Sequence, residues 1–542
     1  MVLTKCNAVM LSRDCFMQES YDVVVVGSGH NGLIVACYLA KAGQKVLVLE
    51  RNSWYGGGVY TAESVAPGFR HDWHSAIHIL IQANPLLAND ELGLKSKYGL
   101  RYANPERVFS TIFDDQSSIV TYGDLDRTCE SIAKLSRRDA DAYRQFAEKS
   151  AKLLPLIVQG LFVPPAPQGA FWALLDQSRE GQELMQIMQR STLDLVREMF
   201  ENEKVMIHLL KFAAEVLISP GEKGTGGILF NMPGFVHAYS PGVAIGGSGA
   251  LVDALIACLR DHGGELRNNV DVEKAVVSGG RAVGVRLKGG DVIAAKTAVV
   301  GQIHPWFLGE FIDGLDPTVT ANAKRTKTAG HGIFISHYAM DKPPEYYAGE
   351  EAGRATLIGM APKDLDGYIR SFDDIRHGEM PRRALLTANV MSQFDPTRAP
   401  PGKAALSITG HAPFELRDGG AQEWDARKEA ISNSVGRQFS EYCSNFTPDN
   451  VKAFHFDSPL DVRRHSPTFQ GGAGSGLGSY FHQIGGHRPT PDLAQYAVPG
   501  IDRMYLAGTF MHPPGGVTGG GRATAIKIIG DLGMDFDKIV GA

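Results

Sequence analysis

The feature that most constrains this chain is a short glycine-rich turn between an apolar strand and a helix. Residues 21–26 (YDVVVV) form a continuous apolar run, which is typical of a parallel strand covered on both faces. The turn at 27–32 (GSGHNG) follows it, then a predicted helix over 33–43 and a second buried strand over 45–50. This order predicts an α/β fold that opens with a Rossmann-like unit.

Each glycine of the turn has a physical role in such a unit. Gly27 permits the sharp turn after the strand, Gly29 lets the backbone approach a pyrophosphate, and Gly32 lets helix and strand pack closely. The helix N-terminus then directs N–H groups and partial positive charge at the phosphates. Glu50, at the end of the second strand, is an acidic residue of the kind that binds a ribose diol. The segment therefore predicts a dinucleotide site.

Two further glycine clusters favour FAD over a nicotinamide cofactor. Glu50-Arg51 is followed by glycines at 56–58, which would bring a loop over the phosphates. Near the other end, a strand at 504–507 leads into Gly508, 512–517 (HPPGGV) and a helix over 522–532. These segments resemble the FAD-dependent amine-oxidase and phytoene-desaturase superfamily, and further matches extend the resemblance over about residues 21–535.

The resemblance implies a Rossmann-like FAD-binding domain that is discontinuous in sequence, together with a substrate domain that has a mixed or antiparallel sheet and a helical insertion. The expected segments are an N-terminal extension (1–20), FAD-binding parts (21–125, 240–305 and 455–542), the helical insertion (126–239) and the sheet of the substrate domain (306–454). The expected cofactor-binding residues are Gly27, Gly29, His30, Asn31, Gly32, Glu50, Arg51, Gly57, Gly58, Val272, Gly508, Gly516 and Val517.

Composition narrows the class of protein. A chain of 542 residues is expected to form more than one domain. The net charge of −5 argues against a nucleic-acid binder, and the absence of a long apolar run argues against a transmembrane segment. Six cysteines without a C-x-x-C pair fit a reducing, cytoplasmic location. The expected partners are a small-molecule substrate and an external electron donor or acceptor.

The leading functional interpretation is an FAD-dependent oxidoreductase that desaturates or reduces a carbon–carbon bond of an apolar or small unsaturated substrate. The resemblance also covers enzymes that use reduced flavin without net redox, so a hydratase of a small unsaturated acid such as a 2-haloacrylate is an alternative. A third reading, of another class, is a non-catalytic binding protein of the Rab GDP-dissociation-inhibitor type.

Histidines supply the candidates for acid–base catalysis. His482 follows two aromatic residues and is expected to line the substrate site, and His512 lies within the C-terminal glycine segment. His71 and His74 are expected to hydrogen-bond loop backbone, although their spacing also suits metal ligands. No metal is expected.

Overall fold

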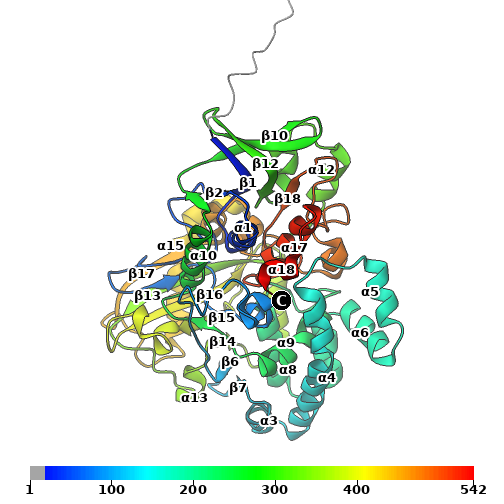
Figure 1. The fold of residues 1–542 in the computed structure, drawn as a ribbon. Coiled ribbons are helices and arrows are strands. Elements are labelled where there is room, and N and C mark those ends of the chain that lie inside the picture. The colour runs from blue at the N-terminus through cyan, green and yellow to red at the C-terminus, as the bar shows by residue number, and fades with distance from the viewer. Residues whose placement is uncertain (1–18, 542) are drawn as a thin grey trace, which may run out of the picture.

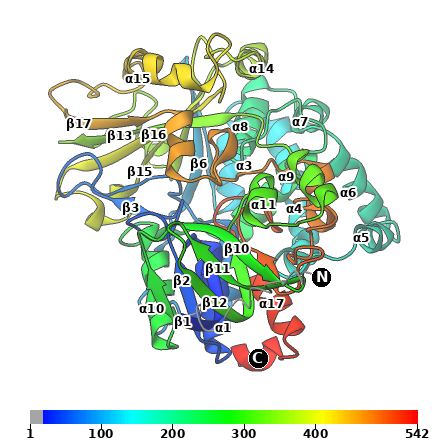
Figure 2. The ribbon, with the colours of Figure 1, turned by 90° about the horizontal axis from the view of Figure 1, so that it is seen from above.

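The computed structural model describes residues 19–541, so most of the predicted N-terminal extension lies outside the described residues. The chain forms two seven-stranded sheets and a mainly helical part, which the cyan ribbon marks in Figure 1. In the view from above, the helical part lies beside both sheets (Figure 2). The predicted α/β fold, with a Rossmann-like unit and a second sheet, is confirmed.

The first sheet, called here the nucleotide sheet, has the order β10-β11-β12-β1-β2-β9, with β18 paired to β12. Strands β1, β2, β9, β12 and β18 are parallel neighbours, whereas β10 and β11 form an antiparallel extension. Its strands are β1 (Glu19–Val26), β2 (Val46–Leu49), β9 (Glu265–Arg267), β10 (Val272–Ser278), β11 (Arg281–Leu287), β12 (Val292–Gly301) and β18 (Met504–Leu506). The parts of this sheet come from three separate regions of the chain.

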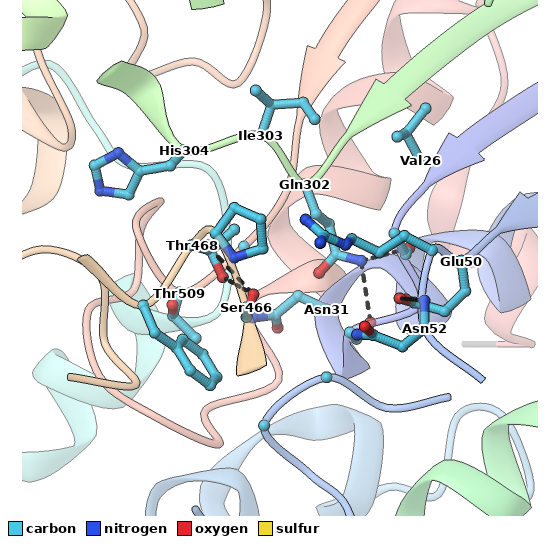
Figure 3. Close-up of a pocket in the computed structure, with 18 of the residues that line it drawn as sticks. Val26, Asn31, Glu50, Asn52, Gln302, Ile303, His304, Ser466, Thr468 and Thr509 are labelled. Atoms are coloured by element: carbon cyan, nitrogen blue, oxygen red, sulfur yellow. Dashed lines mark hydrogen bonds between the residues drawn. The ribbon is translucent and has the colours of Figure 1, made fainter. Parts of the chain in front are cut away.

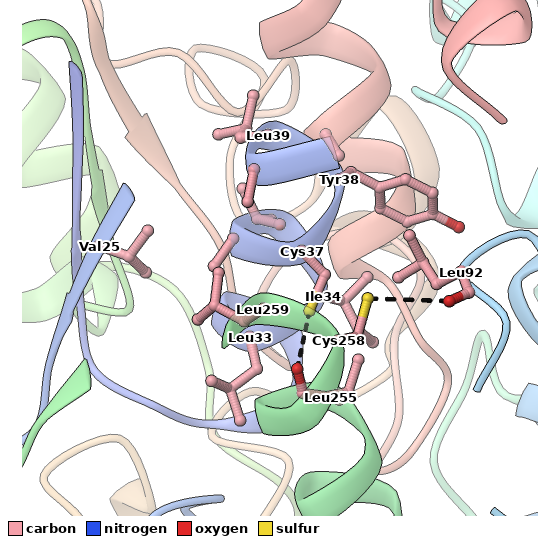
Figure 4. Packing of buried hydrophobic residues seen from close by; sticks show 14 of the residues in the cluster. Val25, Leu33, Ile34, Cys37, Tyr38, Leu39, Leu92, Leu255, Cys258 and Leu259 are labelled. Atoms are coloured by element: carbon pink, nitrogen blue, oxygen red, sulfur yellow. Dashed lines mark hydrogen bonds between the residues drawn. The ribbon is translucent and has the colours of Figure 1, made fainter. Parts of the chain in front are cut away.

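Helices α1 (His30–Lys41), α10 (Gly249–Asp261) and α17 (Gly521–Asp531) cover one face of this sheet. Figure 4 shows Leu33, Cys37 and Leu255 packed between α1 and α10. The Cys37 thiol donates to the Leu255 carbonyl at 3.1 Å, so even the polar atom of this core has a partner. Helix α1 begins at His30, three residues earlier than the sequence predicted, because the second half of the glycine turn is already helical.

The second sheet, called here the substrate sheet, has the order β17-β13-β16-β15-β14-β6-β7 and is antiparallel except at β14 and β6. Its strands are β6 (Arg107–Phe113), β7 (Ser118–Tyr122), β13 (Gly332–Met340), β14 (Leu357–Ala361), β15 (Leu386–Val390), β16 (Ala404–Ala412) and β17 (Val451–Asp457). The expected FAD-binding segment 21–125 thus contains two strands, β6 and β7, that pair in the substrate sheet. Strand β17 spans the expected boundary at residue 454 in the same sheet.

The segment between β7 and β8 is helical, as its periodicity predicted. Its helices are α3 (Leu125–Ala133), α4 (Arg137–Leu161), α5 (Gln168–Leu175), α6 (Arg179–Gln189), α7 (Thr192–Met199), α8 (Glu203–Ala214) and α9 (Gly226–Ala238). The apolar stripe that includes Val205 and Leu209 packs with Phe113 and Ile119 of the substrate sheet into one core. The stripes therefore join this helical part to the sheet.

Shorter elements complete the chain. Strands are β3 (Thr61–Ala62), β4 (His71–Asp72), β5 (Tyr102–Ala103) and β8 (Val243–Ala244); helices are α2 (Pro85–Ala88), α11 (Leu308–Phe311), α12 (Pro317–Lys324), α13 (Glu350–Gly353), α14 (Leu365–Arg376), α15 (Trp424–Ser440), α16 (Pro459–His465) and α18 (Phe536–Val540). Within residues 19–541, no helix combines the length and the apolar character needed to cross a membrane.

Candidate functional site

A pocket of about 360 Å³ opens at the carboxyl ends of β1, β2 and β12. This is the place where doubly wound sheets bind ligands. Figure 3 shows Val26, Glu50 and Gln302 around it, each at or just beyond the end of one of these strands. Of the predicted cofactor-binding residues, all except Gly32 line the pocket: Gly27, Gly29, His30, Asn31, Glu50, Arg51, Gly57, Gly58, Val272, Gly508, Gly516 and Val517.

The glycine turn has the geometry that its sequence requires. Gly27 has a φ of +95°, a conformation that side-chain-bearing residues rarely adopt. A Cβ on Gly32 would lie 2.2 Å from the Nε2 of Gln302 and 2.9 Å from the Gly27 carbonyl oxygen, so Gly32 serves the packing of the turn. A Cβ on Gly29 would lie 2.6 Å from the Oε1 of the same Gln302. Gly27 and Gly29 line the pocket, whereas Gly32 does not.

Gln302, which no motif indicated, lies over this turn. Its Nε2 donates to the carbonyl oxygens of Gly27 at 2.6 Å and Gly29 at 3.3 Å. It directly follows β12, the parallel neighbour of β1, and the pairing of Val26 with Gly301 fixes its position. The Gln302 side chain therefore stabilises the glycine turn, and its position sets the size of the pocket beside Gly29.

The second glycine loop closes against the first. Gly56 forms a bridge with Gly29 and donates its N–H to the Ser28 carbonyl at 3.1 Å. A Cβ on Gly57 would lie 3.2 Å from the Cα of Gly29, so the two backbones approach too closely for side chains between them. The loop therefore covers the turn, and its predicted contact with the phosphates of a cofactor stays a prediction.

The Glu50 carboxylate is buried and already holds the local backbone. Its Oε2 accepts from the N–H of Ser28 at 2.9 Å and from the Ser28 hydroxyl at 2.7 Å. Its Oε1 accepts from the N–H of Asn52 at 2.9 Å. Since Glu50 also lines the pocket, its carboxylate lies beside any ligand there and fixes the loop that would contact it.

Two helix N-termini meet at the pocket. Asn31, in the first turn of α1, accepts a hydrogen bond through its Oδ1 from the N–H of Gly521, which begins α17. A Cβ on Gly521 would lie 2.2 Å from the Asn31 carbonyl oxygen. His30 begins α1, is buried and lines the pocket. Burial lowers the pKa of His30 to about 3, so this end of α1 carries a neutral imidazole. Both helix dipoles favour an anionic ligand here.

The C-terminal wall of the pocket depends on one buried cation, Arg488. Its guanidinium donates to five backbone carbonyl oxygens at 2.9–3.3 Å: those of Leu477, Gly478, Gln483, Thr509 and Met511. No carboxylate among residues 19–541 lies within ion-pair distance of it. Burial lowers the pKa of Arg488 to about 9, so it keeps its proton at neutral pH. It ties the glycine-rich loop at 471–478 to the segment after Gly508.

His74 is the histidine that reaches the pocket from the loop after the second glycine cluster. Its Nε2 lies 3.1 Å from the Nδ1 of His465, while its own Nδ1 is buried without a partner. Burial and, to a lesser degree, the neighbouring His465 lower the pKa of His74 to about 3. When Nε2 carries the hydrogen and donates to His465, Nδ1 is an unoccupied proton acceptor. The sequence predicted a backbone partner for His74, whereas the structure gives it a side-chain partner.

A buried ion pair positions the His74 loop. Asp72 binds the Arg398 guanidinium at 2.6 Å, and both side chains are almost completely buried. Asp72 also accepts from the Thr61 hydroxyl at 2.6 Å and from the Ser248 N–H at 2.9 Å. His71, on the other side of Asp72, lies 3.2 Å from the Tyr338 carbonyl oxygen, which agrees with its predicted backbone contact.

The two predicted catalytic histidines lie outside the pocket lining. His482 is exposed and stacks on Tyr480 at a ring separation of 5.6 Å. His512 is buried behind the C-terminal loop, where its Nε2 lies 3.2 Å from the Gly160 carbonyl oxygen. Over residues 19–541, no three histidine, cysteine or acidic side chains are grouped to hold a metal ion.

Sequence comparison finds relatives over nearly the whole chain. The family model described as FAD dependent oxidoreductase matches residues 22–302. A component of the limonene dehydrogenase of Castellaniella defragrans is 24% identical, with 96% of this chain and 97% of that protein covered. A phytoene desaturase (lycopene-forming) of Pseudescherichia vulneris is also 24% identical, with 94% and 99% covered.

Structural comparison gives the same fold. Cyclohexylamine oxidase from Brevibacterium oxydans superposes with a TM-score of 0.58 at 16% identity, with 95% of this chain and 99% of that chain covered. At this identity the likeness concerns the fold alone. The predicted resemblance to the amine-oxidase and phytoene-desaturase superfamily is confirmed by these matches.

Proposed function

We propose, from the premise that this chain belongs to the FAD-dependent oxidoreductase family, that it binds FAD in the glycine-lined pocket and desaturates or reduces a carbon–carbon bond of a small unsaturated substrate. The observation that carries the proposal is the pocket itself. Glycine segments from the two ends of the chain and the imidazole of His74 all line it. A backbone cradle beside neutral imidazoles suits a flavin-dependent hydride transfer, in which the cofactor takes the hydride and a base takes the proton.

The residues present fit FAD. The close approach of Gly29 and Gly57 leaves a backbone surface for a pyrophosphate, and the N-termini of α1 and α17 supply partial positive charge to it. Glu50 is placed to bind the adenosine ribose while it holds Ser28, and the backbone at Val272 is placed for the adenine. The backbone at Gly508, Gly516 and Val517 is placed for the flavin end.

When bound, FAD supplies a hydride acceptor or donor at one position of its ring system. The chain must then accept or return the proton that accompanies the hydride. His74 is the residue we assign to this task, because it lines the pocket, is neutral at pH 7 and has an unpartnered Nδ1. His30 shares these features through its Nε2, but it begins α1, at the end of the pocket assigned to the phosphates. His465 holds the His74 ring through Nε2 and so leaves Nδ1 as the atom that takes the proton.

The substrate class follows from the relatives. One is named as part of a limonene dehydrogenase and another as a phytoene desaturase, and both names refer to oxidation of unsaturated hydrocarbon chains or rings. We therefore place the reaction of this chain at a carbon–carbon bond, with an electron donor or acceptor outside the chain. The predicted cytoplasmic location stays a prediction.

The first test is the absorption spectrum of the purified protein, followed by anaerobic mixing with limonene as the probe alkene. Bound flavin that is bleached in proportion to the product formed supports the desaturase reaction. Product that forms only after the flavin has been reduced, with many turnovers per reduction, would replace it with the hydratase alternative. A colourless protein that cannot take up added FAD would instead favour the binding-protein reading.

A pair of histidine variants tests the assignment of the base. His74→Gln should slow flavin bleaching by about 10²–10⁴-fold, because the proton acceptor is lost while the glycine cradle is untouched. His482→Gln is the matched control, since this exposed histidine lies outside the pocket. Slower bleaching in His482→Gln with normal rates in His74→Gln would reverse the assignment.

A further inference from the structure

A second group of buried polar side chains lies in the substrate domain, away from the pocket described above. His331 precedes β13, His411 lies in β16, and Tyr368 lies in α14. The two imidazole rings are in contact, with centroids 4.5 Å apart at 82°, and each histidine is only 3% exposed. All four ring nitrogens and the Tyr368 hydroxyl are buried without a hydrogen-bond partner. The ring of Phe372 contacts all three side chains, and we call His331, His411 and Tyr368 the polar cluster.

Five buried polar atoms without partners, all within the polar cluster, need an explanation. A buried donor or acceptor without a partner costs about 1–3 kcal/mol, and folded proteins satisfy nearly all of them. The same domain shows that it can satisfy a buried histidine. His208 of α8 has both ring nitrogens at 2.8 Å from hydroxyls, those of Thr111 and Thr121. The polar cluster is therefore a site whose partners come from outside the chain.

The polar cluster adjoins the wall of the FAD pocket. His411 pairs in register with Ile333 of β13, and Ile333 packs against a core that includes Phe469. Phe469 in turn lines the pocket. Next to His331, a Cβ on Gly332 would lie 2.8 Å from the Gly471 carbonyl oxygen. The polar cluster thus adjoins the strand residues that pack against the pocket wall and the glycine-rich loop.

The chemistry of the polar cluster selects its ligand. Each neutral imidazole offers one N–H donor and one acceptor, and the Tyr368 phenol offers both. The nearby cation, Lys211, is already bound to Glu215 at 2.5 Å and to the Thr387 hydroxyl. A carboxylate would therefore meet no free cation and would face the charge of Glu215. An uncharged group that both donates and accepts, which is a hydroxyl, matches the atoms available.

We infer that the polar cluster binds a hydroxyl group of the substrate, so that the substrate is an unsaturated alcohol and not a plain hydrocarbon. The inference deepens the proposed function and rests on it for the identification of the ligand as the substrate.

The test compares alcohols with their deoxygenated hydrocarbons by calorimetric titration of the full-length protein. The probes are perillyl alcohol against limonene, and geraniol against the hydrocarbon that lacks its hydroxyl. At least one alcohol should bind about tenfold more tightly than its hydrocarbon, the gain from one or two neutral hydrogen bonds. His331→Phe and His411→Phe should abolish that preference. Phenylalanine preserves the ring contact with Phe372, so both variants are expected to fold.

Other outcomes overturn the inference. Equal affinities within both pairs mean that the polar cluster holds only ordered water. A preference for alcohol that persists in both phenylalanine variants places the hydroxyl elsewhere. Calorimetry needs neither flavin nor turnover, so a colourless, inactive protein that still prefers the alcohol refutes the proposed function alone. An active protein without the preference refutes this inference alone.

Discussion

The two sheets of this protein carry their polar and functional residues at different positions along their strands. In the nucleotide sheet, residues 23–26 and 46–49 are buried aliphatics, and functional groups begin only where these strands end. In the substrate sheet, a row of paired residues crosses the middle of four strands: Thr111, Gly359, Thr387 and Thr409. Side chains of α8 bind the hydroxyls of this row, and His411 lies on the same face.

This difference predicts how each site responds to an amino-acid substitution. The first site is made of backbone that only glycine permits, so any added side chain removes ligand space. The second is made of side chains whose partners decide its stability, so a substitution there changes hydrogen bonding before it changes shape. Variants in the two sites can therefore distinguish a loss of ligand space from a loss of hydrogen bonds.

The largest effect is expected at Gly29. Gly29→Val should abolish retention of FAD, because a Cβ there meets Gln302 and the branched methyls extend into the pocket. The flavin-to-protein ratio after gel filtration measures the loss. Gly43→Asn is the control, since an added Cβ at Gly43 has no neighbour within 4 Å and asparagine tolerates the positive φ of this helix end. A folded Gly29→Val protein with full flavin would show that the turn is not a ligand surface.

The next effect is expected at Arg488. Arg488→Met should destabilise the protein by on the order of 3 kcal/mol or more, because several charge-assisted bonds are lost and buried carbonyl oxygens lose their donors. Flavin affinity should fall with stability, since the carbonyl of Thr509 follows the predicted contact at Gly508. Chemical denaturation measures the change. An unchanged denaturation midpoint would mean that the C-terminal wall of the pocket is stable without the Arg488 hydrogen bonds.

The comparison also explains what could be read from the sequence. Backbone sites leave local motifs, so the glycines at 27–32, 56–58 and 508–517 indicated both the fold and the pocket. Gln302 and His74 reach the pocket through strand register and a long loop, and neither leaves a spacing pattern. Residues 107–122 fell within the segment that the sequence assigned to the FAD-binding domain, and only the pairing of β6 with β14 assigns them to the substrate sheet.

The same reasoning applies to the histidines. His482 was predicted to line the substrate site because it follows two aromatic residues. In the structure it stacks on Tyr480 and is exposed. His331 and His411 are far apart in sequence, and only the antiparallel pairing of β13 with β16 brings their rings together. A signal that depends on which strands are neighbours is absent from one sequence taken alone.

A third prediction compares two buried histidines of the substrate domain. His208→Phe should lower the free energy of unfolding by about 2 kcal/mol, because the hydroxyls of Thr111 and Thr121 lose their partner. His331→Phe should leave it unchanged or raise it by about 1 kcal/mol in the absence of ligand, because no bond is broken and two unpartnered nitrogens are removed from the core. Denaturant midpoints of the two variants measure the contrast. Equal losses would indicate that His331 is as fully partnered as His208.

The smallest effect concerns pH and separates the side-chain site from the backbone site. Burial lowers the pKa of His331 from its ordinary 6.5 to about 3. Below pH 6.5 the unfolded chain therefore binds a proton that the folded chain excludes, and stability falls as the pH falls from 6.5 towards 3. Between pH 7 and 5.5 this one residue should cost about 1 kcal/mol.

His331→Phe should remove that part of the acid sensitivity, so its melting temperature should decline less steeply than that of the parent protein over the same interval. Gly29→Ala, a change in the backbone-built site, adds no titrating group and should keep the parent slope. Melting curves of the three proteins recorded at pH 7, 6 and 5.5 make the comparison. Parallel slopes for His331→Phe and the parent would mean that His331 titrates normally and is open to solvent, which would also remove the reason to expect a hydroxyl ligand at the polar cluster.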